Sequence, residues 1–136
     1  MVEESLRSNA GIVGPKIVNW ERPDELLDIG FSVDKLGYLI PRIESGELDQ
    51  EQHDSVSDVF VVSSTVALVR ADLFRAVSGF DEEMGMVGED LDLCWKAHLA
   101  GARVITVPLA LARHREERGK YRSDGEEEKL QDRHLE

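Results

Sequence analysis

The sequence is poor in cysteine, in basic residues and in long hydrophobic runs. Its only cysteine, Cys94, excludes an intrachain disulfide framework and a zinc site built from several cysteines. No apolar run approaches the roughly 20 residues of a membrane span, and the charged start MVEESLR lacks the pattern of a signal peptide. The 16 Lys and Arg residues face 28 Asp and Glu residues, which argues against a nucleic-acid-binding module with a basic face.

What remains is a chain of 136 residues, 41% of them hydrophobic, with a net charge of −12. This length and composition indicate one soluble domain with a real core. Two stretches, 43–58 and 81–92, each carry six acidic residues and no Lys or Arg, so together they account for the whole net charge. We interpret the first stretch as a solvated loop. The second is embedded among apolar residues and glycines, which is atypical of a simple solvated loop.

Short-range patterns predict an alternation of helices and strands. Residues 56–70 carry the strongest strand signal, with Val59 to Val62 buried on both faces and a bend at Ser63-Ser64. A helix is expected from about Glu89 to Ala100, after Gly88 and with Gly101 as its stop; Leu91, Trp95 and Leu99 lie on one face of it. The other expected elements are a helix over 2–9, a strand over 11–20 that is broken or lies at a sheet edge, short hairpin strands within 21–42, a polar loop over 43–57, a short helix over 72–77, a strand over 104–107 ending at Pro108, an extended piece over 109–114 and a charged tail over 115–136.

Several motifs in the second half of the chain follow one another in a specific order. They are Arg70-Ala-Asp-Leu-Phe74, Gly79-Phe-Asp-Glu82, Glu89-Asp-Leu-Asp-Leu-Cys-Trp-Lys96, Ala100-Gly-Ala-Arg-Val104, Val107-Pro108 and His114. This order closely resembles the second half of the catalytic domain of family 2 glycosyltransferases, the inverting, nucleotide-sugar-dependent enzymes of GT-A fold. Gly11-Ile-Val-Gly-Pro-Lys16 also resembles the strand that follows their metal-binding region.

The resemblance implies an α/β chain with a partial GT-A fold, a mixed sheet and flanking helices. Residues 1–114 would form the acceptor-side half of the domain, followed by a charged tail over 115–136. The family's nucleotide-binding half, which ends in a metal-binding Asp-x-Asp, would be absent. We therefore expect this chain alone neither to bind a nucleotide sugar tightly nor to turn over.

Inverting sugar transfer needs a base that takes the proton of the acceptor hydroxyl. The resemblance assigns this role to Asp90, with Glu89 as its neighbour in the acceptor site. The structural alternative is that both carboxylates only charge the first turn of a surface helix. Asp90-Leu-Asp92 is not expected to chelate a metal, because residues two apart on a helix point about 200° apart.

The resemblance also suggests residues around the reacting groups. His114 matches a histidine that completes a metal site for the donor diphosphate, although Arg113 replaces the usual aromatic residue before it; a surface histidine is the equal alternative. Gly79, Phe80 and Asp81 would form the loop that supports the acceptor, with Phe80 more readily interpreted as a core anchor. Trp20 would serve as a stacking platform or, more simply, be partly buried. Cys94 and Trp95 are expected to pack.

Two functions from different classes therefore remain. The first is a fragment of an inverting glycosyltransferase of polysaccharide or glycolipid synthesis. Its full-length form would use Mn²⁺ or Mg²⁺, a nucleotide-sugar donor and a carbohydrate or lipid-linked acceptor. It would lie in the cytoplasm, at or near the inner face of the membrane, with a homodimer through an exposed sheet edge. The alternative is a non-enzymatic acidic α/β module that binds a protein partner or calcium. An upstream strand-helix pattern ending in Asp-x-Asp would favour the transferase.

Overall fold

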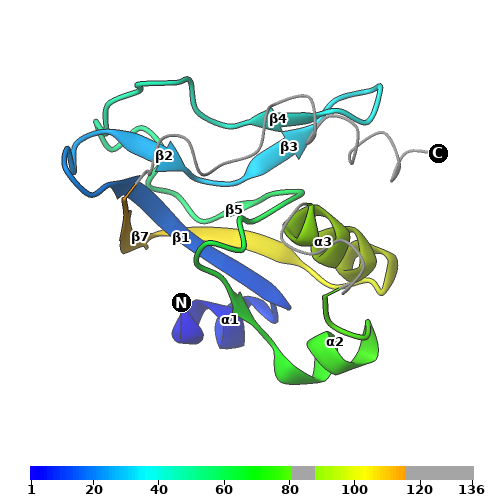
Figure 1. Cartoon of the computed structure of the whole chain (residues 1–136). Coiled ribbons are helices and arrows are strands. Elements are labelled where there is room, and N and C mark those ends of the chain that lie inside the picture. Colours follow the sequence, from blue (N-terminus) through cyan, green and yellow to red (C-terminus); the bar gives the residue numbers. More distant parts are fainter. Residues whose placement is uncertain (81–87, 116–136) are drawn as a thin grey trace.

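The computed structural model describes residues 1–80 and 88–115 of the chain. Within these ranges the chain forms a mixed five-stranded sheet, a separate two-stranded hairpin and helices around them (Figure 1), which confirms the α/β prediction. The elements are α1 (Val2–Ser8), β1 (Ile12–Asn19), β2 (Leu26–Asp28), β3 (Phe31–Val33), β4 (Leu39–Pro41), β5 (Ser57–Asp58), β6 (Leu68–Val69), α2 (Ala71–Ala76), α3 (Glu89–Leu99) and β7 (Val104–His114).

The sheet is built around β1, which pairs along one side with β7 in parallel. On its other side β1 pairs with β6 near its start and with β2 near its end, both antiparallel. The expected edge position of residues 11–20 is therefore wrong, and β1 is the central strand. Its almost continuous burial fits a strand covered on both faces. In Figure 1 the β3–β4 hairpin lies above this sheet and α1 lies below it.

The expected break in this strand is present and explains how prolines fit into a central position. Pro15 pairs with Val107, but the next residue, Lys16, pairs with Leu111, so the register shifts at this point. Because a proline has no N–H to donate, Pro15 and Pro108 are tolerated where the ladder is interrupted. The predicted end of the strand at Pro108 is wrong, since β7 continues through this irregularity to His114.

Residues 56–70 do not form the single long strand that the sequence predicts. Only β5 and β6, of two residues each, are regular strands at the two ends of this segment. Between them the backbone passes from one partner to another: Val59 N–H donates to Val104 O, and Phe60 N–H donates to Phe31 O. The chain then turns at 64–66, close to the predicted bend. The buried valines were correctly predicted, but their burial comes from crossing the core, not from one ladder.

The hydrophobic core lies on both faces of the central strands. Ile12 and Val104 belong to a cluster with residues 59–62 and α3, whereas Val13 and Ile105 belong to a second cluster on the opposite face. α3 buries Leu91, Leu93, Cys94 and Ala97. Of the predicted face of Leu91, Trp95 and Leu99, only Leu91 is therefore fully buried. Leu99 is 77% exposed, and Trp95 lies at the margin of the core, edge-on to Phe60.

Short-range sequence signals predict the N-terminal helix and its end correctly, but not which face of this helix is buried. α1 ends at Asn9, whose left-handed φ of 53° matches the predicted helix stop. The helix faces the sheet through Ser5, whose hydroxyl donates to Ala10 O at 3.0 Å. Val2 and Leu6 are consequently exposed. Neither α1 nor any other helix in the described ranges has the length and apolar character needed to span a membrane.

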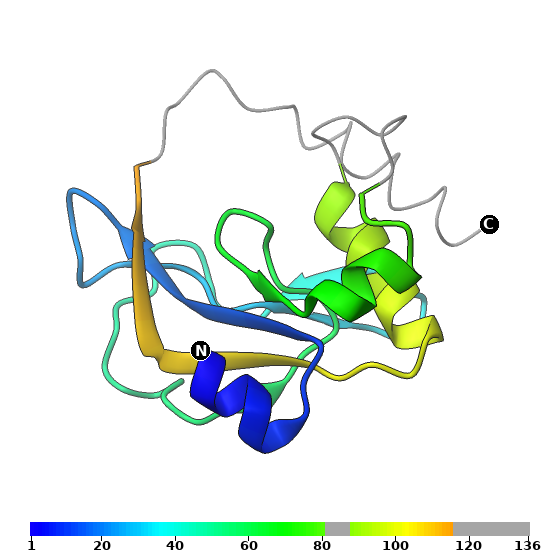
Figure 2. The same ribbon diagram turned by 90° about the horizontal axis from the view of Figure 1, so that it is seen from below.

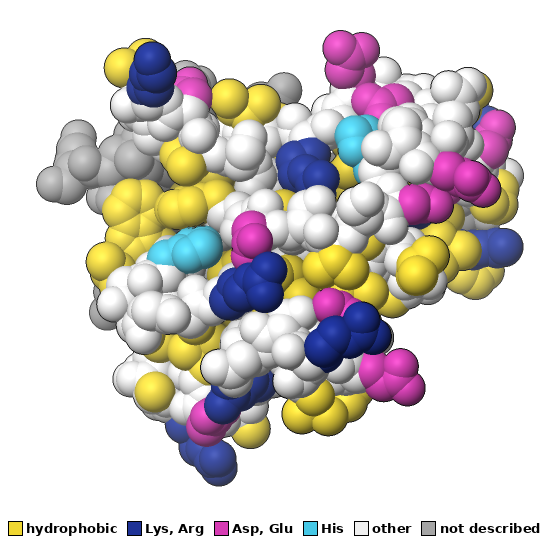
Figure 3. All heavy atoms as spheres, turned by 180° about the vertical axis from the view of Figure 1, so that it is seen from behind, with side chains coloured by type: hydrophobic (Ala, Val, Ile, Leu, Met, Phe, Trp, Pro, Cys, Tyr) yellow, Lys and Arg dark blue, Asp and Glu magenta, His cyan; other side chains and the backbone are white. Residues whose placement is uncertain are grey.

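No residue of the acidic loop 43–58 is buried, in agreement with its interpretation as a solvated loop, but ion pairs also attach this loop to the core. The side chain of Lys16, only 6% exposed, reaches from β1 to Asp49 at 2.9 Å and to Asp54 at 2.6 Å. Glu47 lies 2.6 Å from the His53 ring within the same loop. Figure 3 shows from behind that acidic side chains gather on the side of the molecule that carries this loop.

Gly14 is the position in β1 where the sheet admits no larger residue. A Cβ at this position would lie well inside van der Waals contact with Val62 Cγ1. We expect Gly14→Ala to lower the free energy of unfolding by about 1–3 kcal/mol, as overpacking does in a dense core. Urea denaturation monitored by circular dichroism measures this change. The double variant Gly14→Ala/Val62→Ala should lose less than the sum of the two single losses, and strict additivity would contradict the predicted clash.

Candidate functional site

Glu89 and Asp90 lie at the N-terminal end of α3, as predicted. Gly88 precedes the helix with a φ of 74°, a left-handed conformation that favours glycine. The free N–H groups of this first turn favour negative charge, and Asp90 Oδ1 accepts a hydrogen bond from Leu91 N–H at 2.8 Å. Asp92, by contrast, forms an ion pair with Lys96 at 2.9 Å. Asp90 and Asp92 therefore have different partners.

The environment of Asp90 raises the pKa of its carboxyl group. Burial is the main cause, because it disfavours the charged form. The nearby charges of Glu89 and Asp28 act in the same direction, while hydrogen bonds from the backbone of Leu91 and Ser64 oppose them. A carboxylate whose pKa is raised in this way holds a proton more readily than an ordinary aspartate does. This property suits a group that accepts a proton during a reaction.

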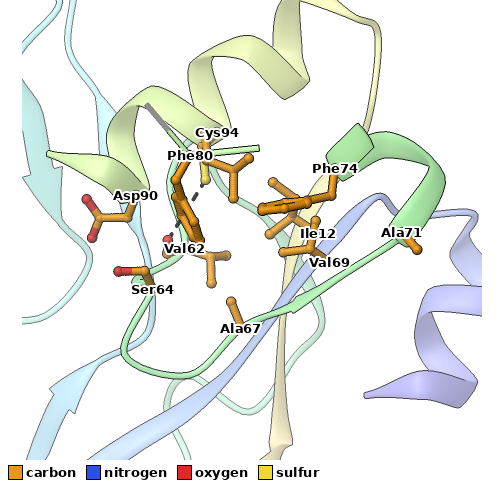
Figure 4. Close-up of a pocket in the computed structure, with 11 residues that line it drawn as sticks. Ile12, Val62, Ser64, Ala67, Val69, Ala71, Phe74, Phe80, Asp90 and Cys94 are labelled. Carbon is orange, nitrogen blue, oxygen red and sulfur yellow. Dashed lines mark hydrogen bonds between the residues drawn. The ribbon is translucent and has the colours of Figure 1, made fainter. Parts of the chain in front are cut away.

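Asp90 lies at one end of an apolar cavity of about 450 Å³ between α2, α3 and the central sheet. Figure 4 shows the rings of Phe74 and Phe80 in the cavity, with Asp90 and Ser64 together at its edge. The carboxylate and the Ser64 hydroxyl point to the same side, away from the Phe74 ring. The remaining lining is mostly aliphatic: Ile12, Val62, Ala67, Val69, Ala71, Leu93 and Cys94.

Two of the three predicted acceptor-loop residues lie beside this cavity. Gly79 is buried with a φ of 62°, a Cβ there would meet the Phe74 ring at 2.8 Å, and its carbonyl oxygen accepts a hydrogen bond from Lys96 Nζ at 2.9 Å. Phe80 packs edge-on against Phe74 with ring centroids 5.5 Å apart. It remains 42% exposed and lines the cavity, so it contacts both the core and the open space. Asp81 lies outside the described residues.

Trp20 and His114 lie together in a different part of the structure. Trp20 follows the end of β1, His114 is the last residue of the parallel strand β7, and Trp20 N–H donates to His114 O at 2.9 Å. Neither residue lines the cavity beside Asp90. Trp20 is half exposed, with the Arg115 guanidinium 5.8 Å from the centre of its ring. Figure 2 shows the end of β7 and the start of α3 on the same side of the molecule, with the loop after Val62 between them.

The predicted metal ligand His114 is not part of a recognisable metal centre in the described ranges. Across residues 1–80 and 88–115, no three His, Cys, Asp or Glu side chains come together in a way that could hold a metal ion. The described residues alone thus do not supply a complete set of metal ligands. The role of His114 stays a prediction.

No sequence motif points to three residues that lie near Asp90 in the fold. Ser64 Oγ donates to Glu89 Oε1 at 2.7 Å, and Asp28 at the end of β2 lies close enough for its charge to act on Asp90. Ser63 lies near enough to Asp28 to oppose the rise in its pKa that burial causes. The only local signal was the bend expected at Ser63-Ser64, and no short-range pattern connects it with a residue 35 positions earlier.

Comparison with known proteins gives a partial match. No family model matches the chain. Pre-mycofactocin glycosyltransferases of Mycobacterium tuberculosis, from strains CDC 1551 / Oshkosh and ATCC 25618 / H37Rv, are each 47% identical to the chain over 58 residues. The match covers 43% of the chain and 12% of the length of each relative, so it spans a small part of these curated proteins. This similarity supports a relationship of the chain to glycosyltransferases and suggests glycosyl transfer.

Proposed function

We propose that the chain is the acceptor-side part of an inverting, family 2 glycosyltransferase of GT-A fold, with residues 1–114 forming that half of the domain. The observation that carries this proposal is the position of Asp90: a partly buried carboxylate at a helix N-terminus, at the end of an apolar cavity. The partial similarity to two glycosyltransferases supports the same reaction class.

In the proposed reaction the acceptor hydroxyl lies against the Asp90 carboxylate. Asp90 takes the hydroxyl proton while the oxygen forms a bond to the anomeric carbon of the donor sugar. The bond from that carbon to the nucleotide diphosphate breaks, and the diphosphate leaves with the electron pair. Because attack and departure occur on opposite faces of the sugar, the anomeric configuration inverts. The raised pKa of Asp90 makes it a stronger base than an exposed aspartate.

The cavity favours an acceptor that carries an apolar group beside its reacting hydroxyl. Phe74, Phe80 and the aliphatic lining provide an apolar surface, and Asp90 and Ser64 provide the polar end. A lipid-linked or aromatic acceptor satisfies both requirements, whereas a bare carbohydrate would leave the apolar lining in contact with water. The relatives are named for pre-mycofactocin, so we include an acceptor of that kind among the candidates.

The test uses the complete reading frame that encodes this chain, incubated with a panel of nucleotide sugars. Each donor is paired with an alkyl or aryl glycoside, with a lipid-linked sugar and with a free sugar as acceptor. We expect release of nucleotide diphosphate and an inverted product, both faster with the apolar acceptors. Mass spectrometry detects the product and NMR assigns its anomeric configuration. A retained configuration would exclude the inverting mechanism, and the absence of transfer with every donor would overturn the proposed function.

A further inference from the structure

We propose that the turn at Ser63-Ser64, together with Asp28 on β2, positions the two carboxylates at the start of α3. Asp28, Ser63 and Ser64 are positioning residues in this proposal, because they act on Asp90 and Glu89 and not on a substrate. The catalytic meaning of the inference rests on the proposed function. The physical link between β2 and α3 does not depend on it.

The turn is fixed in place from the core side. The segment before it is held by Phe31 N–H, which donates to Val61 O at 2.9 Å, and by the buried side chain of Val62. The thiol of Cys94 on α3 donates to Val62 O at 3.8 Å, which ties the helix to the same segment. Ser63 is further constrained because Thr65 N–H donates to its Oγ at 3.2 Å. The backbone before the two serines is therefore held firmly, and the serines lie at a defined position beside α3.

Each serine lies beside a different carboxylate. The Ser64 hydroxyl donates to Glu89 Oε1 at 2.7 Å, and the Ser64 backbone is one of the groups that oppose the rise in the pKa of Asp90. The Ser63 hydroxyl donates to Thr65 Oγ1 at 3.0 Å and lies near Asp28, whose Oδ1 accepts from Gly30 N–H at 2.7 Å. Two adjacent residues thus lie between the end of β2 and the start of α3.

The end of β2 packs closely against the segment that precedes the Ser63-Ser64 turn. Gly30 follows β2 with a φ of +91°, and a Cβ at this position would lie 3.1 Å from Val61 O and 3.1 Å from Thr106 Cγ2. The Asp28 carboxylate is consequently held beside the turn. Burial raises the pKa of Asp28, while its hydrogen bonds from Gly30 and Ser63 oppose that shift.

The charged and titratable groups that face Asp90 are few in the described part of the chain. They are Glu89 on the same helix, Asp28 from β2 and Cys94 one turn further along α3. Burial raises the pKa of the Cys94 thiol to about 12, so this group stays neutral. Asp28 is therefore the one facing charge contributed by another element, and removing it relieves a like-charge interaction with Asp90.

The experiment is a carboxyl-detected NMR titration of Asp90 in the 136-residue chain, which requires no enzymatic activity. We expect Asp28→Asn to move the Asp90 midpoint to lower pH, while the matched substitution Asp24→Asn at an exposed site leaves it unchanged. Asp28→Glu keeps the negative charge, so its Asp90 midpoint should lie closer to the wild-type midpoint than that of Asp28→Asn does. An Asp90 midpoint that is the same in Asp28→Asn and in Asp24→Asn would overturn the inference.

Two further measurements separate this inference from the proposed function. If Asp28→Asn does not fold, Ser63→Ala provides the second variant, because loss of the hydroxyl favours protonated Asp28 and should move the Asp90 midpoint in the same direction. In the complete reading frame, the acid limb of kcat/KM should move to lower pH with Asp28→Asn by the shift seen in NMR. An NMR shift without any transferase activity would refute only the proposed function. Activity with an unchanged NMR midpoint and an unchanged acid limb would refute only the positioning role.

Discussion

Asp90→Asn is expected to lower the turnover number for sugar transfer by about 10²–10⁴-fold, the usual contribution of a positioned general base. Asparagine has nearly the same shape and still accepts the hydrogen bond from Leu91 N–H, but it takes no proton at neutral pH. The loss should appear in kcat more than in KM, because the missing interaction belongs to the transition state. Initial rates with a saturating apolar acceptor, in the complete reading frame, measure it.

The same substitution should leave stability unchanged or increased at neutral pH. The pKa of Asp90 is raised in the folded state, so the folded protein binds this proton more tightly than the unfolded chain does. The ionised carboxylate therefore reduces stability as pH rises from about 4, the unfolded value, through the higher folded value. Asp90→Asn removes this dependence. Lost activity together with retained or increased stability is the combination expected of a catalytic group and not of a structural one.

Asp92→Asn is the matched control for this prediction. It makes the same chemical change two residues later, at a side chain that pairs with Lys96 and does not line the cavity. We expect it to change kcat by much less than Asp90→Asn does, with a small loss of stability from the helical ion pair. Equal losses of kcat in the two variants, or a large loss of stability in Asp90→Asn, would assign Asp90 a structural role.

The features that the sequence predicted well depend on neighbouring residues. Helix α3 begins after Gly88 and ends before Gly101, because glycines and first-turn acidic residues are local signals for helix ends. The same local signals predict that Glu89 and Asp90 lie at a helix N-terminus. The family resemblance then supplied a chemical role that helix signals alone do not give.

The features that the sequence missed depend on contacts between distant segments. Residues 56–70 look like one strand because valines favour extended structure, yet their backbone partners lie on β7 and β3, far away in the chain. The buried face of α3 could not be predicted for the same reason. Cys94 and Ala97 are buried because the segment at Val62 packs against them, and helical periodicity alone does not show which segment packs on a helix. Asp28 joins the candidate site only through the fold.

Lys16→Met is expected to cause a large loss of stability. Methionine keeps most of the buried volume but removes the charge that faces Asp49 and Asp54. Breaking a buried ion pair on one side typically costs about 3–5 kcal/mol, since the remaining charge is left without a partner. The two carboxylates are 25% and 33% exposed and retain part of their hydration. We therefore expect a loss near the lower end, about 3 kcal/mol, by urea denaturation at pH 7.

The loss should depend on pH in a defined direction. The hydrogen bond from Lys16 is the main cause that lowers the pKa of Asp49, so the folded state favours its ionised form. Such a group contributes stability that is present above the unfolded pKa, about 3.9, and that is lost as pH falls through the lower folded value. Burial alone would lower the pKa of Lys16, but the two carboxylates raise it, which keeps the lysine charged throughout this range. The wild type and Lys16→Met should therefore converge in stability below about pH 4.

Two controls separate the ion pairs from other effects of the substitution. Lys35→Met makes the same change at an exposed site and should alter stability little. The triple variant Lys16→Met/Asp49→Asn/Asp54→Asn removes all three charges and should recover part of the loss, because no carboxylate is then left facing an apolar side chain. A loss for Lys16→Met of only about 0–1 kcal/mol, the range of exposed salt bridges, would show that the acidic loop is held no more firmly than a solvated one. A full loss with recovery in the triple variant would instead establish that loop 43–58 is fixed to the central strand through Lys16.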